Sequence, residues 1–214
     1  MRSAVCAAGA AVVLALVGCT PETPDYQSIW TTTTTTTTTT MTEAPVPFSQ
    51  YLESTGVGAQ QVAPDTLTDL TVSMPTPPGW SKQTSPKISP MTQVIAKNDN
   101  YPMAMLIVFK LNGDFDPAEV VKHANADAVL WENFKQLDAS AAGFHGFPSS
   151  MIQGSYDLGG RRLHSYNRVV IATGSPPGHQ RYLVQLAVTS LADQAVAHSD
   201  DIDTIINGFT VAAK

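Results

Sequence analysis

The residues best suited to binding chemistry gather on one predicted strand. Arg162, His164, Tyr166 and Arg168 are spaced two residues apart. Because the side chains of a strand alternate between its two faces, all four are expected on the same face of a sheet. A small basic and aromatic patch on a chain of formal net charge −6 suits an anionic lipid or an acidic protein surface. The four residues are therefore a candidate contact surface, and the alternative is a solvated sheet face beside a hairpin.

No other set of side chains forms a recognisable catalytic or metal-binding motif. The five histidines are scattered, and the sequence contains no Gly-x-Ser-x-Gly, His-Glu-x-x-His or Walker-type glycine loop. Asp200, Asp201 and Asp203 resemble a metal site in composition, but they lie near the start of a predicted helix, where carboxylates interact favourably with the helix dipole. The sequence therefore predicts no catalytic residue, no metal and no cofactor. The negative net charge also argues against a nucleic-acid partner.

The thiol of Cys19 is the second group with distinctive chemistry. An apolar stretch follows Arg2, and it is about as long as the hydrophobic region of a signal peptide and too short to span a membrane comfortably. The sequence Leu16-Val17-Gly18-Cys19 resembles the lipobox of bacterial lipoprotein precursors, in which the cysteine sulfur is alkylated by a diacylglycerol donor. The resemblance predicts a signal peptide over residues 1–18 and lipid on Cys19. The protein would then be exported and held on the outer face of the plasma membrane or in the cell envelope. The alternative is an ordinary signal peptide or a buried cysteine.

Residues 19–60 are expected to form a lipidated tether. Ten consecutive threonines occupy 31–40, with prolines on both sides. Such a segment has no apolar period to bury and cannot offset the entropy of ordering. Whether its threonines carry sugars or form a bare spacer is open. Phe48, Tyr51 and Leu52 are candidates for a first short element of the domain.

Residues 61–214 are expected to form one globular domain of strands and helices. The predicted strands cover 67–74, 92–96, 103–111, 150–158, 162–172 and 181–191. Gly159-Gly160 is a hairpin signal, and hairpins require antiparallel pairing. The predicted fold class is therefore α+β, with a mostly antiparallel sheet flanked by helices.

Two helices are predicted within this domain. The first runs over 116–141, because Asp116 is a good N-cap, Pro117 suits the first helical position, and apolar residues recur at three- and four-residue steps. Trp131 lies in the middle of its apolar face and is expected to be largely buried. The second helix runs over 192–207 and ends at Gly208.

The chain resembles the mycobacterial LpqN/LpqT lipoproteins, whose domain is assigned a PsbP-like fold. The resemblance rests on the lipobox, the Thr/Pro tether, a strand leading into 75–80, the segment 131–134, and a strand-strand-helix unit ending at Gly208-Phe209. It implies a PsbP-like α/β/α sandwich. The family brings no established catalytic residues to carry over to this chain.

The resemblance also implies what the protein does. PsbP-like domains generally act as accessory or assembly factors, so a non-enzymatic binding or adaptor module of the cell envelope is expected, with a monomeric domain. Its partners would be the membrane, through the lipid anchor, and an envelope protein or lipid, including machinery that handles mycolate-containing lipids; a host protein is a further option. Two alternatives are a carrier that holds a hydrophobic ligand between sheet and helix, and an enzyme of unidentified type.

Overall fold

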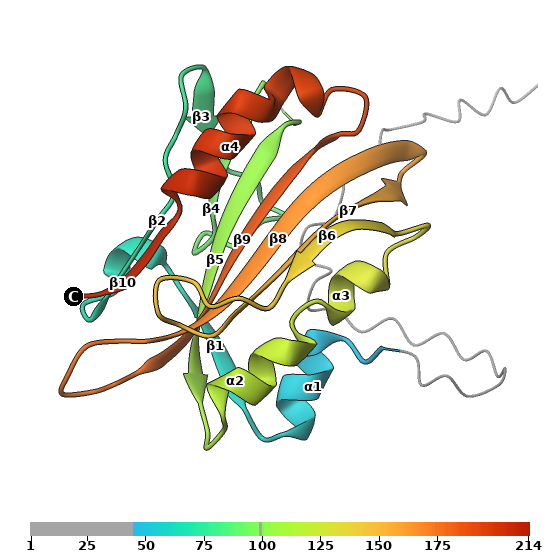
Figure 1. The fold of residues 1–214 in the computed structure, drawn as a ribbon. Coiled ribbons are helices and arrows are strands. Elements are labelled where there is room, and N and C mark those ends of the chain that lie inside the picture. Colours follow the sequence, from blue (N-terminus) through green and yellow to red (C-terminus); the bar gives the residue numbers. More distant parts are fainter. Residues whose placement is uncertain (1–44, 99) are drawn as a thin grey trace, which may run out of the picture.

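The computed structural model describes residues 45–98 and 100–214, drawn as a ribbon in Figure 1. The predicted signal peptide, Cys19 and the threonine run lie outside the described residues. The helices are α1 Phe48–Ser54, α2 Pro117–Val120, α3 Ala126–Val129 and α4 Ser199–Gly208, with 3-10 turns η2 Pro64–Thr66, η3 Val121–His123 and η4 Val196–His198. The strands are β1 Gly58–Val62, β2 Leu70–Ser73, β3 Trp80–Lys82, β4 Gln93–Lys97, β5 Met103–Asn112, β6 Lys135–Ser140, β7 Ser149–Leu158, β8 Arg161–Thr173, β9 Arg181–Leu191 and β10 Thr210–Ala213.

The strands form one large sheet and one small ribbon. The large sheet has eight strands in the order β3-β4-β5-β9-β8-β7-β6, and β1 pairs with β5. The ribbon pairs β2 with β10, and every strand pair in both sheets is antiparallel. The predicted α+β class with a mostly antiparallel sheet is confirmed.

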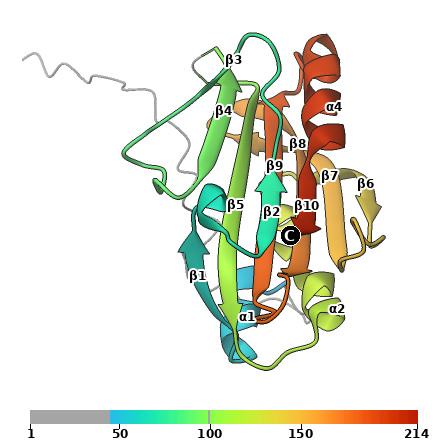
Figure 2. The same cartoon turned by 90° about the vertical axis from the view of Figure 1, so that its left-hand side faces the viewer.

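Both faces of the large sheet are covered, which produces two apolar cores. In Figures 1 and 2, α4 and the β2–β10 ribbon lie against one face, and α1 to α3 gather against the other. Side chains of Ile205 and Phe209 belong to the first core, and those of Leu52 and Val120 belong to the second. Strand β5 contributes side chains to both cores, because successive residues point to opposite faces of the sheet. Its almost continuous apolar sequence is of the kind expected for a central strand.

The long helix predicted over 116–141 is wrong beyond its first half. Asp116 caps α2 as expected, and its Oδ1 accepts the backbone N–H of Ala118 at 2.9 Å. The chain then forms only short turns as far as α3, reaches Asn133 at a φ of 51°, and continues as strand β6. A positive φ interrupts a right-handed helix, so no helix forms past Asn133 although the apolar residues keep their helical spacing.

A close contact across the β6–β7 pair explains why this segment becomes a strand. The ring of Phe134 lies over Gly154 of β7, so close that a Cβ at Gly154 would be 2.4 Å from Phe134 Cε2. Lys135 pairs with Ser155 and Gln136 with Gly154, and a bulge follows at Leu137. Long-range pairing therefore overrides the local helical pattern.

Trp131 packs against the second core as expected, but it is only partly buried. Its indole lies 4.2 Å from the ring of Tyr156 and 6.1 Å from the ring of Phe134, measured between centroids. Trp80 is the more buried tryptophan, with 6% of its surface exposed. Because the helix ends at Val129, Trp131 lies in the connection to β6, at the rim of the second core.

The packed domain begins earlier than the predicted boundary at residue 61. Helix α1, within the segment assigned to the tether, buries Phe48 and Leu52. Its first N–H, on Phe48, donates to Asp127 Oδ1 at 3.1 Å and ties the helix to α3. At the other end of the chain, the second predicted helix begins as η4, continues as α4 and ends at Gly208, which packs so closely on Pro75 that a Cβ would be 2.7 Å from Pro75 Cγ.

Candidate functional site

Three of the four predicted contact residues lie together in a groove between the sheet and α4. The even-numbered residues of β8 face the α4 side, as the alternation requires. We call this concavity, of about 340 Å³, the α4 groove. Its sheet side carries the polar residues Asp138, Gln153, His164, Tyr166, Arg168 and Ser190. Its helix side carries Ala195, Ser199, Ile202, Asp203 and Ile206.

Arg168 is the cation of this groove, and neutral partners hold it in place. Its Nε donates to the Tyr166 hydroxyl at 2.7 Å, and its Nη1 donates to Ser149 Oγ at 3.1 Å. The guanidinium carbon lies 4.7 Å from the centroid of the Phe144 ring, which in turn stacks on Phe209 at 5.1 Å. Within the part of the chain that the structure describes, Arg168 forms no ion pair. The guanidinium is therefore oriented while its charge is uncompensated, an arrangement suited to an anionic partner.

Arg162, the fourth predicted residue, does not line the groove. Its guanidinium forms an ion pair with Asp157 at 3.0 Å and donates to Ser155 and to the Asn133 carbonyl. The side-chain hydrogen bonds from Asn133 and Arg162 lower the pKa of Asp157. This arginine fastens the β7–β8 hairpin to the start of β6, so its charge is already paired.

His164 adds polarity to the groove but little charge at neutral pH. Its Nε2 lies 3.0 Å from Gln153 Nε2 on the neighbouring strand. Burial lowers the pKa of His164 below its ordinary value of 6.5. The positive charge of the groove at neutral pH therefore comes from Arg168.

Two further features of the groove carry no signal in the sequence. Ser190 is 1% exposed, and its hydroxyl has no hydrogen-bond partner among the residues described. Asp138 and Asp203 are exposed at the rim, and neither carboxylate forms an ion pair within the described residues. The register of β8 with β9 and the placement of α4 bring these groups to one groove, and neither is apparent before the fold is known.

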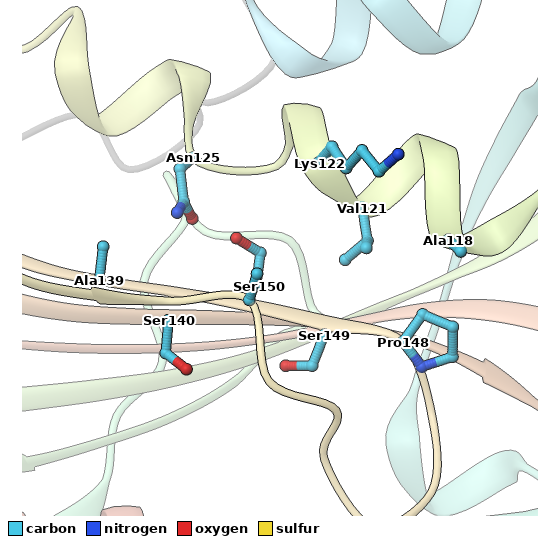
Figure 3. A pocket seen from close by; sticks show the side chains of 10 residues that line it. Ala118, Val121, Lys122, Asn125, Ala139, Ser140, Pro148, Ser149 and Ser150 are labelled. Carbon is cyan, nitrogen blue, oxygen red and sulfur yellow. The ribbon is translucent and has the colours of Figure 1, made fainter.

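A second concavity lies where β6 and β7 diverge into their connecting loop. This hairpin pocket, about 580 Å³, is lined by Ala118, Val121, Lys122 and Asn125 from the segment that holds α2 and η3, and by residues 139–141 and 148–150. Figure 3 shows the Ser150 hydroxyl and the Asn125 amide turned toward each other across it. The Asn125 amide donates to the Met151 carbonyl at 3.3 Å. Most of its lining residues are small, so the pocket can accept an apolar group of a ligand.

One acidic residue of α4, Asp201, serves the fold. Asp201 pairs with Lys97 at 2.8 Å and accepts the Trp80 indole N–H at 3.1 Å. The hydrogen bond from Lys97 lowers the pKa of Asp201. Among residues 45–98 and 100–214, no three His, Cys, Asp or Glu side chains gather as a metal-binding group.

The fold and the grooves define a small α+β domain whose distinctive surface feature is a charged groove beside one helix. In the part of the chain that the structure covers, no helix is long and apolar enough to cross a bilayer. Comparison with known proteins narrows the class: residues 44–212 match the family described as "Probable lipoprotein LpqN", and the chain belongs to this lipoprotein family.

Individual relatives agree with this assignment. The chain is 59% identical to the putative lipoprotein LpqT of Mycobacterium tuberculosis over 212 residues, which cover 99% of this chain and 94% of that protein. It is 28% identical to lipoprotein LpqN of the same organism over 147 residues, covering 66% and 63% of the two chains. The crystal structure of LpqN, described as involved in cell envelope biogenesis of M. tuberculosis, has a TM-score of 0.64 at 22% identity and covers 77% of this chain and 96% of that one. This likeness shows that the two proteins share the fold.

Proposed function

We propose that the protein is a non-enzymatic binding or adaptor module of the cell envelope, held there by lipid on Cys19, and that the α4 groove contacts its partner. The relatives are named as lipoproteins, and the LpqN structure is linked by its description to cell envelope biogenesis. Both support an envelope role for this chain. Envelope proteins or lipids, including machinery that handles mycolate-containing lipids, are the proposed partners, and a host protein is a further candidate.

The observation that carries this proposal is the oriented and uncompensated charge of Arg168. Positioning a guanidinium on two aromatic rings and two hydroxyls reduces the entropy lost when it binds. Arginine is also among the residues most often found at the energetic centre of protein interfaces. A groove with such a residue beside an apolar wall of Ile202 and Ile206 has the composition of a contact site.

Comparative capture from the envelope tests the proposal. The tagged full-length protein is expressed in a mycobacterial host, solubilised in mild detergent, and its co-purifying proteins and lipids are quantified. Arg168→Gln should weaken binding of the specific partner by about tenfold or more and lower its recovery accordingly, because a hydrogen-bonded charge contributes about 1.5–3 kcal/mol. Arg161→Gln is the matched control, since Arg161 is exposed on the same strand and lies outside the groove. Equal recovery with both variants would remove the α4 groove as the contact surface.

The hairpin pocket supports a second candidate function, that of a carrier for a hydrophobic ligand. Its volume of about 580 Å³ lies within the range of small-molecule sites, and its small side chains leave room for an apolar chain. Native mass spectrometry of the purified protein should then detect a bound lipid. Ala141→Trp should abolish that mass increment by filling the pocket, while Ala142→Trp, beside the pocket, should preserve it. A ligand unaffected by Ala141→Trp would lie elsewhere.

A further inference from the structure

The α4 groove keeps opposite charges apart. Arg168 on β8 and the carboxylates of Asp138 on β6 and Asp203 on α4 all line it. Nevertheless, no ion pair joins them within the described residues. Because these opposite charges are not paired with each other, each remains available to a bound molecule, and a molecule that reaches both would gain from two attractive contacts.

The remaining polar groups make the groove a binding site with directional preferences. His164 is held neutral by burial, which lowers its pKa, so Arg168 alone attracts an anion there. Arg168 uses Nε and Nη1 for Tyr166 and Ser149, which leaves Nη2 to donate to a ligand. Ser190 pairs in register with His164, four residues along β8 from Arg168, and its unpartnered hydroxyl lies at the far end of the groove. A buried polar atom without a partner is unusual and suggests that an outside group completes its bonding.

We infer that the α4 groove binds a small zwitterion, with its phosphate or carboxylate on Arg168 and its ammonium group between Asp138 and Asp203. The inference rests on the proposed function and names the ligand chemistry of that groove. A volume of about 340 Å³ suits a headgroup-sized molecule. Ile202 and Ile206 contact the carbon atoms that join the two charges.

Titration of the full-length protein with O-phosphoethanolamine, followed by amide NMR shifts, tests the charge pairing. The zwitterion should bind about tenfold more tightly than inorganic phosphate or ethanolamine alone, because each of these satisfies only one of the two charge sites. The largest shifts should fall on β8 and α4. A phosphate affinity equal to that of the zwitterion, shifts confined to other elements, or the lack of any saturable shift would each overturn the inference.

Two variants separate the halves of the site. Arg168→Gln should weaken zwitterion binding about tenfold, and Arg161→Gln should leave it unchanged. The exposed double change Asp138→Asn with Asp203→Asn should weaken zwitterion binding and strengthen phosphate binding, because it removes the ammonium partners and the repulsion of the anion together. Since both carboxylates are on the surface, this protein should fold normally. Zwitterion binding that survives the double change undiminished contradicts the assigned ammonium position.

The source of the zwitterion is resolved by a third probe. Glycerophosphoethanolamine carries the same two charges on the glycerol unit of a phospholipid, so tighter binding than O-phosphoethanolamine indicates a lipid headgroup, and weaker binding indicates a free small molecule. The inference and the proposed function fail separately. If the titration fails but partner capture still depends on Arg168, only the zwitterion inference is overturned. If partner capture is unchanged by Arg168→Gln, the groove is overturned as the partner surface.

Discussion

Replacing Gly154 by alanine tests the strand that the sequence misassigned as helix. The added Cβ would lie 2.4 Å and 2.6 Å from two ring carbons of Phe134 and 2.7 Å from the Lys135 carbonyl oxygen. Overpacking of this kind costs about 1–3 kcal/mol, and the backbone contact cannot be relieved by a rotamer change. The loss is reduced by the lower entropy of an unfolded chain with alanine, worth about 0.4–1 kcal/mol. We expect a net loss of about 1–2 kcal/mol and a Tm lowered by about 3–6 °C.

Thermal unfolding followed by circular dichroism measures this effect. Gly178→Ala is the matched control, because a Cβ there has no neighbour within 4 Å. Combining Gly154→Ala with Phe134→Leu should recover part of the loss, since the ring contact is removed while the contact with Lys135 remains. A Gly154→Ala protein as stable as the Gly178→Ala protein would mean that Phe134 does not lie over β7, and the described β6–β7 pairing would be wrong.

Three further outcomes follow from the same contacts. Trp131→Ala should cost about 2 kcal/mol, less than the 3–5 kcal/mol typical of a fully buried aromatic, as measured by urea unfolding; a larger loss would contradict its half-buried position. Because the fold lowers the pKa of Asp201 below its ordinary value of 3.8, its ion pair with Lys97 should stabilise the protein at neutral pH and lose that effect as the pH falls through the folded pKa. The difference in Tm between the parent and Asp201→Asn should therefore shrink below pH 3.8, and a constant difference would refute this assignment. Cys19→Ala should release the protein from the membrane fraction or leave an unprocessed precursor, whereas a mature-sized, fully membrane-bound variant would contradict lipidation.

Strands with strong local patterns were predictable from the sequence. The β5 strand and the β7–β8 hairpin are each indicated by residues that are adjacent in the sequence. Gly159 and Gly160 adopt the positive φ values of 55° and 72° that a tight hairpin needs. The alternation on β8 likewise placed His164, Tyr166 and Arg168 on one face. Local patterns therefore identified the sheet and half of the groove.

The features that depend on distant contacts were not predictable in this way. Apolar residues at helical spacing continue to Phe134, but Gly154, twenty residues later, decides that the segment pairs as a strand. The hydrogen bond from Arg162 to the Asn133 carbonyl joins residues 29 apart in the chain, so it is visible only once the position of Asn133 beside the hairpin is known. The groove forms only because α4 packs next to β8, and the residue spacing within α4 or β8 does not predict that packing.

Site-specific photo-crosslinking in living cells tests the central claim most directly. A photoreactive amino acid at Ser199, an exposed residue that lines the α4 groove, should crosslink the envelope partner, and the product should be lost when Arg168→Gln is added. The same probe at Asp65, an exposed position outside the groove, should give no such product. Crosslinking from Asp65 but not Ser199, or a product at Ser199 that persists without Arg168, would contradict the account of the α4 groove as the contact surface.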